Sequence, residues 1–369
     1  MKKKLLSLVL ALTMTLSMGT VAMADEPMDA SVTTNTVTIY KDYVANEEND
    51  HDTAKSPAET LSFTVNSVSI EDAGTNANGV VDITVDSMPK PTIDNVSIEE
   101  DAADINDGTK HEITVKLPAY SVVGVYTYEI TENDGNMAGV EYLRHPIKLV
   151  VTVQQAENGK IVVAGVHCED PEDGDAVKVD SFENTYSAGK LAISKTVTGN
   201  LGDQTKKFNV KVTFNAPTGE TVGAAITYRV GTEALEITKE EWNNGTVEKI
   251  IALKHGETIT FENIPYGVKY TVEETDYTAD GYDAAVYRGT DITNKNIQFT
   301  GDNSVTEGST EKPENISIDA AEQNVTIENH KAAEVDTGIN LDSMPYILIL
   351  AAVAVGGVAI ISKKRREEF

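Results

Sequence analysis

The centre of the chain reads SFENTYSAGKLAISK from Ser181 to Lys195, and this stretch decides how the fold is divided. Both halves alternate apolar and polar residues, as β-strands do. The small residues 187–189 between them form a linker too short to be a disordered spacer. The pattern therefore predicts the last strand of one β-domain followed directly by the first strand of another. Asn184 closes the first unit and Lys195 opens the second.

Composition limits the class of protein. The chain has 369 residues, enough for two domains of ordinary size, and 40% of them are hydrophobic, as in globular proteins. The formal net charge is −29, which makes nucleic acid and anionic lipid surfaces poor partners. The one cysteine, Cys168, excludes an intramolecular disulfide, so any internal cross-link must use other chemistry.

The two ends of the chain predict export and anchoring. Residues 1–24 have a basic start, an apolar centre and a small-x-small end, which together predict a secretory signal peptide. Residues 25–35 are polar and are expected to form a flexible leader. Residues 345–362 are apolar enough for a transmembrane helix, and the basic residues 363–369 are expected to stay in the cytoplasm.

Between these ends the sequence predicts an all-β fold. Runs rich in Val, Ile, Thr and Tyr alternate with Asn, Asp and Gly turns, and no long helical periodicity occurs before the tail. We expect a first β-sandwich over residues 36–186, a second over 187–331, and a stalk over 332–344. The expected strands are 36–41, 59–65, 111–117, 123–130, 146–155, 160–166 and 176–182, then 190–197, 207–214, 225–230, 246–253, 258–264, 268–274, 283–287 and 324–329.

A triple of Lys, Glu and Asn occurs twice, in the same order and at similar spacing. Each unit has a lysine in its first strand, a glutamate in a strand that follows Gly-Val, and an asparagine in its last strand. The residues are Lys41, Glu132 and Asn184 in the first unit and Lys195, Glu274 and Asn329 in the second. In the first unit Glu129 is an alternative to Glu132, since the two point to opposite faces of the strand.

The physical chemistry of such a triple predicts a covalent bond. Each lysine is in phase with the apolar residues of its strand and should point into the core. Desolvation lowers the pKa of an amine and raises that of a carboxyl, which leaves a nucleophilic amine beside a proton shuttle. The expected product is a Lys–Asn isopeptide bond that joins the first and last strands and carries tension past the hydrogen bonds between them.

These residues resemble a known family. The motifs Thr38-Ile39-Tyr40-Lys41, Phe182-Glu183-Asn184, Leu191-Ala192-Ile193-Ser194-Lys195 and Ile327-Glu328-Asn329 are similar to those of sortase-assembled backbone pilins of the streptococcal T-antigen type, as are the strands ending in Glu132 and Glu274. The resemblance implies immunoglobulin-like (CnaB-like) sandwiches, with Glu132 and Glu274 as the proton shuttles. It also implies a structural shaft subunit at the cell wall, which is a sortase substrate rather than an enzyme. The alternative is a wall-anchored adhesin that does not polymerise.

The residues before the anchor resemble a sortase signal. Thr337-Gly338 precedes the apolar segment, although Glu334-Val335 stands where the common signal has Leu-Pro. By resemblance, a sortase cleaves between Thr337 and Gly338. It then passes the threonine to a lysine of a neighbouring pilin subunit or to a peptidoglycan precursor.

The resemblance implies an acceptor lysine a few residues before the closing asparagine of the first domain, which Lys178 fits, with Lys160 and Lys190 as alternatives. The sequence predicts no cofactor and no metal. The acidic loop 169–175 lacks the ligand spacing of an EF-hand.

Overall fold

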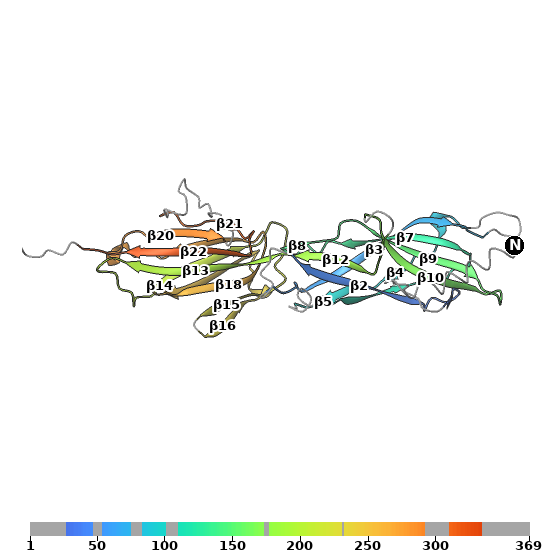
Figure 1. Cartoon of the computed structure of the whole chain (residues 1–369), viewed down its shortest axis with the longest axis horizontal. Coiled ribbons are helices and arrows are strands. Elements are labelled where there is room, and N and C mark those ends of the chain that lie inside the picture. The colour runs from blue at the N-terminus through green and yellow to red at the C-terminus, as the bar shows by residue number, and fades with distance from the viewer. Residues whose placement is uncertain are drawn as a thin grey trace, which may run out of the picture.

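The computed structural model describes residues 27–46, 54–74, 83–100, 110–172, 177–230, 232–291 and 310–333. Strands arranged in four sheets make up nearly all of its regular structure, which confirms the all-β prediction. The sheets form two domains that lie end to end in an elongated rod (Figure 1). Within the described ranges there is no helix with the length and apolarity that a bilayer span requires. The predicted signal peptide, sortase signal and transmembrane helix lie outside these ranges.

The first domain packs two sheets against each other. Apolar side chains of both sheets, such as Ile39 on one and Tyr128 on the other, form a single core. One sheet has the order β1 (Met28–Asp29), β10 (Ile161–Asp170), β9 (Ile147–Gln155), β7 (Gly124–Asn133), β3 (Glu59–Glu71) and β5 (Val96–Ile98), with β11 (Val177–Val179) also pairing with β10. The other has the order β4 (Thr92–Ile93), β6 (His111–Lys116), β2 (Thr36–Ala45), β12 (Ser181–Tyr186) and β8 (Val140–Glu141).

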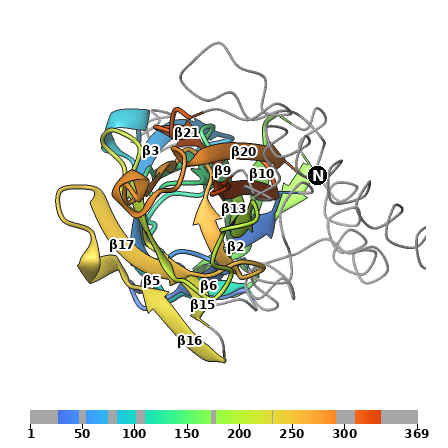
Figure 2. The same ribbon diagram turned by 90° about the vertical axis from the view of Figure 1, so that its left-hand side faces the viewer.

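The second domain repeats this two-layer plan. Its first sheet has the order β16 (Glu233–Ile237), β15 (Ile226–Val230), β18 (Thr258–Pro265), β13 (Ala188–Thr198), β22 (Glu322–His330) and β20 (Val286–Asp291). Its second sheet has the order β17 (Thr246–Leu253), β14 (Phe208–Asn215), β19 (Lys269–Glu274) and β21 (Ile316–Ser317). The view along the rod shows the β15–β16 hairpin projecting from the body of the domain (Figure 2).

In each domain the strand that carries the predicted lysine is a parallel neighbour of the last strand. β2 pairs with β12, and β13 pairs with β22, in each case within one sheet. Antiparallel hairpins connect sequential strands, whereas a parallel pair needs a long crossover. Here the strands between them form the crossover, so two strands that are far apart in the sequence lie side by side.

The seam between the domains is shorter than predicted. Ser187 alone separates β12 from β13, because Ala188 and Gly189 already belong to β13 of the second domain. The Ser187 N–H donates to the Gly139 carbonyl at 2.8 Å, and the Ser187 carbonyl accepts from the Tyr266 N–H at 2.9 Å. A Cβ on Gly139 would lie 2.5 Å from the Ser187 carbonyl, so the seam is packed too closely for any other residue there.

Asn263 ties the domains together beside this seam. Its side chain is buried, and its Nδ2 donates to the Ala225 carbonyl within the second domain. Its Oδ1 accepts from the Lys55 N–H and from the Tyr186 hydroxyl of the first domain. Asn263 adopts a φ of 60°, a left-handed conformation that asparagine tolerates better than most residues. The domains therefore meet through hydrogen bonds as well as through the chain.

The predicted leader over residues 25–35 is wrong for its described part. Residues 28–29 form β1, which pairs with Val162 and Val163 of β10. Ala30 is fully buried, and its carbonyl accepts from the Tyr120 N–H at 2.8 Å. Two paired residues are too few to show an alternating pattern, so polarity alone misidentified this segment.

Candidate cross-link sites

Lys41 lies in the core of the first domain. It sits on β2 with the buried residues Val37 and Ile39 on the same face, and its side chain is completely inaccessible to solvent. Its partner in the parallel ladder is Phe182, and its Nζ donates to the Phe182 carbonyl at 3.0 Å. The amine is therefore held against the last strand of the domain.

Glu132 reaches the same point from the facing sheet. Its Oε2 lies 3.3 Å from Lys41 Nζ, and its Oε1 accepts from Asn184 Nδ2 at 2.7 Å. The structure chooses between the two glutamates of β7, because Glu132 is buried whereas Glu129 is partly exposed on the other face. One carboxyl thus bridges the lysine and the asparagine.

Asn184 completes the first cluster and is fully buried. It follows Phe182 by two residues and so shares its face of β12. Its Oδ1 accepts from the Leu143 N–H at 3.0 Å, a contact that the sequence did not predict. A backbone donor at this position polarises the amide carbonyl and would stabilise negative charge that develops on its oxygen.

The surroundings of Lys41 make its neutral form easier to reach. Burial lowers the pKa of the Lys41 amine to about 8, although the nearby Glu132 carboxyl opposes this shift. A neutral amine has a free lone pair and is a nucleophile, whereas an ammonium is not. The cluster therefore holds an activated amine, a proton carrier and a polarised amide in contact.

The second cluster has the same register. Lys195 pairs with Ile327 across the β13–β22 ladder, and Asn329 follows Ile327 by two residues. Lys195 Nζ donates to the Ile327 carbonyl at 3.3 Å and contacts Asn329 Oδ1. Glu274 comes from the facing sheet, with its Oε2 3.1 Å from Lys195 Nζ. The six predicted residues therefore form two buried clusters of three.

Burial also shifts the pKa values of both titratable groups in the second cluster. It lowers the pKa of the Lys195 amine, against the attraction of the Glu274 carboxyl. It raises the pKa of Glu274, against the attraction of Lys195. The two shifts are those expected for a neutral amine beside a neutral acid.

Aromatic rings close the end of the second cluster. Lys195 Nζ lies 4.5 Å from the centroid of the Phe208 ring, which is itself fully buried. Lys206 lies over Phe208, Tyr277 and Tyr282 and forms an ion pair with Asp280. These rings exclude water from the end of the domain where Lys195 lies.

Besides Glu132 and Asp42, the first domain has another buried carboxyl, which sequence reasoning missed. Glu59 begins β3 and is 7% exposed, and its Oε2 accepts from the Tyr142 hydroxyl at 2.8 Å. No sequence signal separated Glu59 from the many other glutamates, because only tertiary packing brings it near Lys41.

The three candidate acceptor lysines differ in exposure. Lys178 is exposed on the short strand β11, opposite Glu169. Lys160 is also exposed, with 67% of its side chain accessible, whereas Lys190 is partly buried. Lys178 and Lys160 are therefore open to a partner, and the predicted cleavage residues Thr337 and Gly338 lie outside the described residues.

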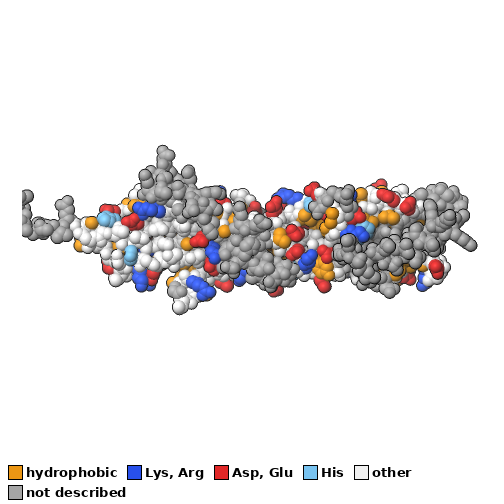
Figure 3. All heavy atoms as spheres, in the orientation of Figure 1, with side chains coloured by type: hydrophobic (Ala, Val, Ile, Leu, Met, Phe, Trp, Pro, Cys, Tyr) orange, Lys and Arg blue, Asp and Glu red, His pale blue; other side chains and the backbone are white. Residues whose placement is uncertain are grey.

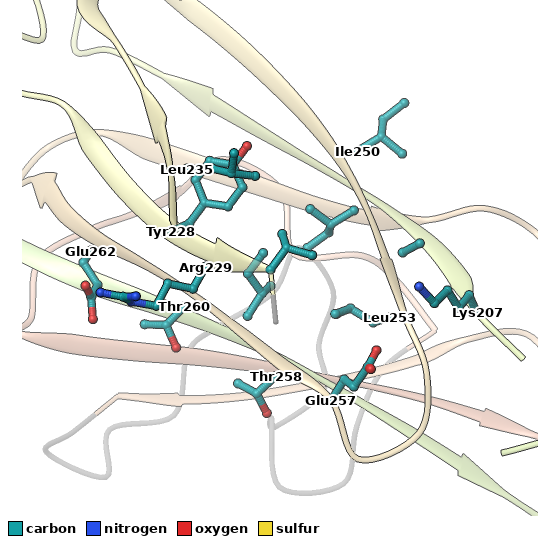
Figure 4. A pocket seen from close by; sticks show the side chains of 14 residues that line it. Lys207, Tyr228, Arg229, Leu235, Ile250, Leu253, Glu257, Thr258, Thr260 and Glu262 are labelled. Carbon is teal, nitrogen blue, oxygen red and sulfur yellow. The ribbon is translucent and has the colours of Figure 1, made fainter. Parts of the chain in front are cut away.

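The clusters do not open onto the groove of the second domain shown in Figure 4. This groove has a volume of about 660 Å³ and lies beside the β15–β16 hairpin and β17. Tyr228, Leu235 and Ile250 line it together with charged residues, but none of the six cluster residues is among its described lining. In the part of the chain that the structure describes, no group of three His, Cys, Asp or Glu side chains could hold a metal ion.

The outer surface differs from these buried clusters. On the face shown in Figure 3, acidic and basic side chains are interspersed along both domains.

Cys168 lies in the core, where burial raises the pKa of its thiol to about 12 and keeps it unreactive.

Comparison with known proteins identifies the class that this fold and these clusters define. The family described as the Spy0128-like isopeptide containing domain matches residues 33–187, and a domain of unknown function, DUF7601, matches residues 189–331. The solved major pilin T3.2 of Streptococcus pyogenes serotype GAS13637 has a TM-score of 0.51 and 19% identity over 81% of this chain and 99% of that chain. That likeness shows a shared fold.

Two curated sequences are also similar. A pilin of Streptococcus pyogenes serotype M1 is 30% identical over 262 residues, which cover 69% of this chain and 70% of that pilin. The pilus tip adhesin Cpa of Streptococcus pyogenes is 32% identical over 97 residues, 26% of this chain and 13% of the adhesin. The chain therefore belongs to the pilin family, and the predicted resemblance to streptococcal backbone pilins is confirmed.

Proposed function

We propose that the chain is a pilus shaft subunit whose two domains each form an internal Lys–Asn isopeptide bond, and that a sortase joins the subunits. The bonds would link Lys41 to Asn184 and Lys195 to Asn329. One observation carries the proposal. Both lysines donate to the carbonyl of the residue opposite them on a parallel last strand, and both asparagines lie two residues further along.

The chemistry follows from the contacts of the first cluster. Lys41 first gives a proton to Glu132, and the neutral Nζ attacks Cγ of Asn184. A C–N bond forms while the bond from Cγ to Nδ2 breaks. Glu132 gives the proton that it holds to the departing Nδ2, which leaves as ammonia, and takes one from the attacking nitrogen. The fold supplies the rate by holding the groups in place, so each domain reacts once.

The second cluster would react in the same way. Glu274 contacts Lys195 Nζ, and its carboxyl would carry the proton from that amine to the Asn329 amide nitrogen. Bonds between the first and last strands would route tension through covalent links. They would also stabilise against unfolding a secreted chain that has one cysteine and therefore no intramolecular disulfide.

Polymerisation would use two regions of the chain, a lysine of the first domain and the residues that follow the second domain. A sortase would cleave between Thr337 and Gly338 and transfer the threonine acyl group to Lys178 of a neighbouring subunit. The last subunit would pass to a peptidoglycan precursor, which places the pilus at the cell wall after transient anchoring by residues 345–362. The exposure of Lys178 supports this role.

Mass spectrometry of the purified ectodomain tests the internal bonds. The wild-type chain should be lighter than its sequence by two molecules of ammonia, and tryptic mapping should recover Lys41 joined to Asn184 and Lys195 joined to Asn329. Replacing Asn184 by Ala should restore the mass of one ammonia and leave the second bond intact. A wild-type mass equal to that of the sequence would reject the isopeptide proposal.

Immunoblots of wall extracts test polymerisation. A shaft subunit gives a ladder of high-mass species, and K178A should remove it while K160A and K190A retain it. The similarity to a tip adhesin over 97 residues favours, as a second candidate, a wall-anchored adhesin that does not polymerise. A single band from the wild-type chain would support that candidate.

A further inference from the structure

Glu59 is a buried carboxyl for which the proposed reaction has no role. It lies at the start of β3, in the sheet that also carries Glu132, and is 7% exposed. Burying a carboxyl without an adjacent cation is costly, and such a group either pairs with a charge or takes up a proton. No salt bridge involves Glu59 among the described residues, so its position requires an explanation.

A short hydrogen-bond chain fixes one oxygen of Glu59. The Met137 N–H donates to the Tyr142 hydroxyl at 3.0 Å, and that hydroxyl donates to Glu59 Oε2 at 2.8 Å. A Cβ on Gly135 would lie 2.1 Å from Oε2, so the turn after β7 closes directly over the carboxyl. The other oxygen, Oε1, is buried and has no hydrogen-bond partner in the described part of the chain.

The same segment connects Glu59 to the reacting amide. Tyr142 holds the Glu59 carboxyl, and the next residue, Leu143, donates its N–H to Asn184 Oδ1 at 3.0 Å. Charge interactions also link Glu59 to both Lys41 and Glu132. Glu59 is therefore connected to the first cluster in two ways, through the segment 142–143 and through electrostatic interactions with its charged groups.

We propose that Glu59 is a positioning residue that controls formation of the first cross-link through its charge. This inference depends on the isopeptide chemistry of the proposed function. As a neutral acid, Glu59 lets Lys41 release its proton to Glu132, whereas as a carboxylate it holds Lys41 in the ammonium form. Glu59 exchanges its own proton with solvent and is neither consumed nor bonded in the reaction.

The groups that face Glu59 determine where it changes charge. They are Tyr142 from the segment after β8, Glu132 from β7, Lys41 from β2 and Asp134 from the turn after β7. Burial raises the pKa of Glu59 to about 7, and the Glu132 and Asp134 charges act in the same direction. The Tyr142 hydrogen bond and the Lys41 charge act in the opposite direction. The control would therefore operate near neutral pH.

The second domain provides the contrast. The carboxyls that act on Lys195 are Glu274, its direct partner, and Glu328, which is ion-paired with Arg288. The second bond should therefore lack a neutral-pH control of this kind, and it serves as an internal reference in the same molecule.

The test follows both bonds during folding of the full ectodomain. Chain recovered unfolded from inclusion bodies is diluted into buffers from about pH 5.5 to about pH 8, quenched in acid and mapped by mass spectrometry. For E59Q, the rate of the first bond relative to wild type should be close to one at about pH 5.5. The ratio should rise several-fold through neutral pH, because each unit by which the Lys41 pKa falls multiplies its neutral fraction by about ten while the ammonium predominates. The second bond should form at the wild-type rate throughout.

Tyr142→Phe is the second variant and does not depend on how well E59Q folds. It removes the hydrogen bond that favours the carboxylate, so Glu59 should ionise at higher pH, and the first bond should accelerate over the wild type near pH 7 only. Equal rates for wild type and both variants at every pH would overturn the inference while the proposed function stands. A chain that forms neither bond would overturn both.

Discussion

The two clusters share their geometry but differ in what surrounds them. In both, a lysine and an asparagine lie on parallel neighbouring strands of one sheet, and a glutamate reaches them from the facing sheet. Both lysines lie near an aromatic ring, Tyr43 in the first cluster and Phe208 in the second, but only the first has the buried carboxyl of Glu59 as a neighbour among the described residues. Strand register therefore sets the arrangement of the reacting groups, and the residues that surround each cluster can modify their chemistry.

Of the changes considered, removal of either lysine should reduce the stability of the protein most. Lys41→Ala and Lys195→Ala each abolish one bond, and because the two closed loops are of similar length the losses of unfolding free energy should be similar. The loop-entropy relation for disulfides gives about 4–5 kcal/mol for loops of this size. Denaturant unfolding with intact-mass analysis measures both effects. A bond lost without any loss of stability would show that the cross-links act only under tension.

A pH series should distinguish the cross-linked from the uncross-linked first domain. In Asn184→Ala, Lys41 keeps its Glu132 partner but remains an amine. Burial lowers its pKa to about 8 in the folded state, against an ordinary value of 10.5. Between these values the unfolded chain binds more protons, so stability should rise with pH, by up to about 3 kcal/mol.

The wild type is the control for this series. Its Lys41 nitrogen is an amide once the bond has formed, so it has no proton to release and this rise should be absent. Urea unfolding at several pH values between about 7.5 and 10.5 measures the difference. Parallel curves for the two proteins would contradict the assignment of Lys41 to the bond.

A glycine substitution gives a smaller effect, confined to the first cluster. In Gly135→Ala the new Cβ would collide with Glu59 Oε2, and we expect a loss of about 1–3 kcal/mol from overpacking. Gly165→Ala on β10 is the matched control, since a Cβ there meets no atom within 4 Å. Thermal unfolding should separate the two variants, with the second domain unaffected in both. Equal unfolding temperatures would show that the turn after β7 can shift to accept the extra methyl group without loss of stability.

Much of the fold could be predicted from the sequence because strand alternation is a local property. The run around Leu191 and Ile193 identified β13, and the motif ending in Asn184 identified β12. Short strands such as β1 and β21 were missed, since two residues cannot show a period. The β15–β16 hairpin was predicted only in part, because β16 is mostly exposed and lacks an apolar face.

The residues of the candidate sites also fall into those that the sequence could predict and those that it could not. The Lys, Glu and Asn triple occurs twice in the sequence in the same order. This repetition predicted the six residues that the structure brings together in two clusters. The family resemblance already favoured Glu132 over Glu129, and the structure shows that Glu132 lies on the buried face of β7. Glu59, Tyr142 and the Leu143 N–H were not predicted, since their roles depend on a turn that folds over the cluster.

The sequence by itself determined which residue types could react and the strands on which they lie, because nucleophilicity and alternation belong to single residues and short segments. The tertiary structure decided that β2 lies parallel to β12 and β13 parallel to β22. In this register each asparagine lies two residues beyond the position opposite its lysine, which brings the two side chains together. The tertiary structure also decided the charge state of the buried groups. Loss of water, which acts only once two sheets have closed, lowers the pKa of Lys41 and raises that of Glu59.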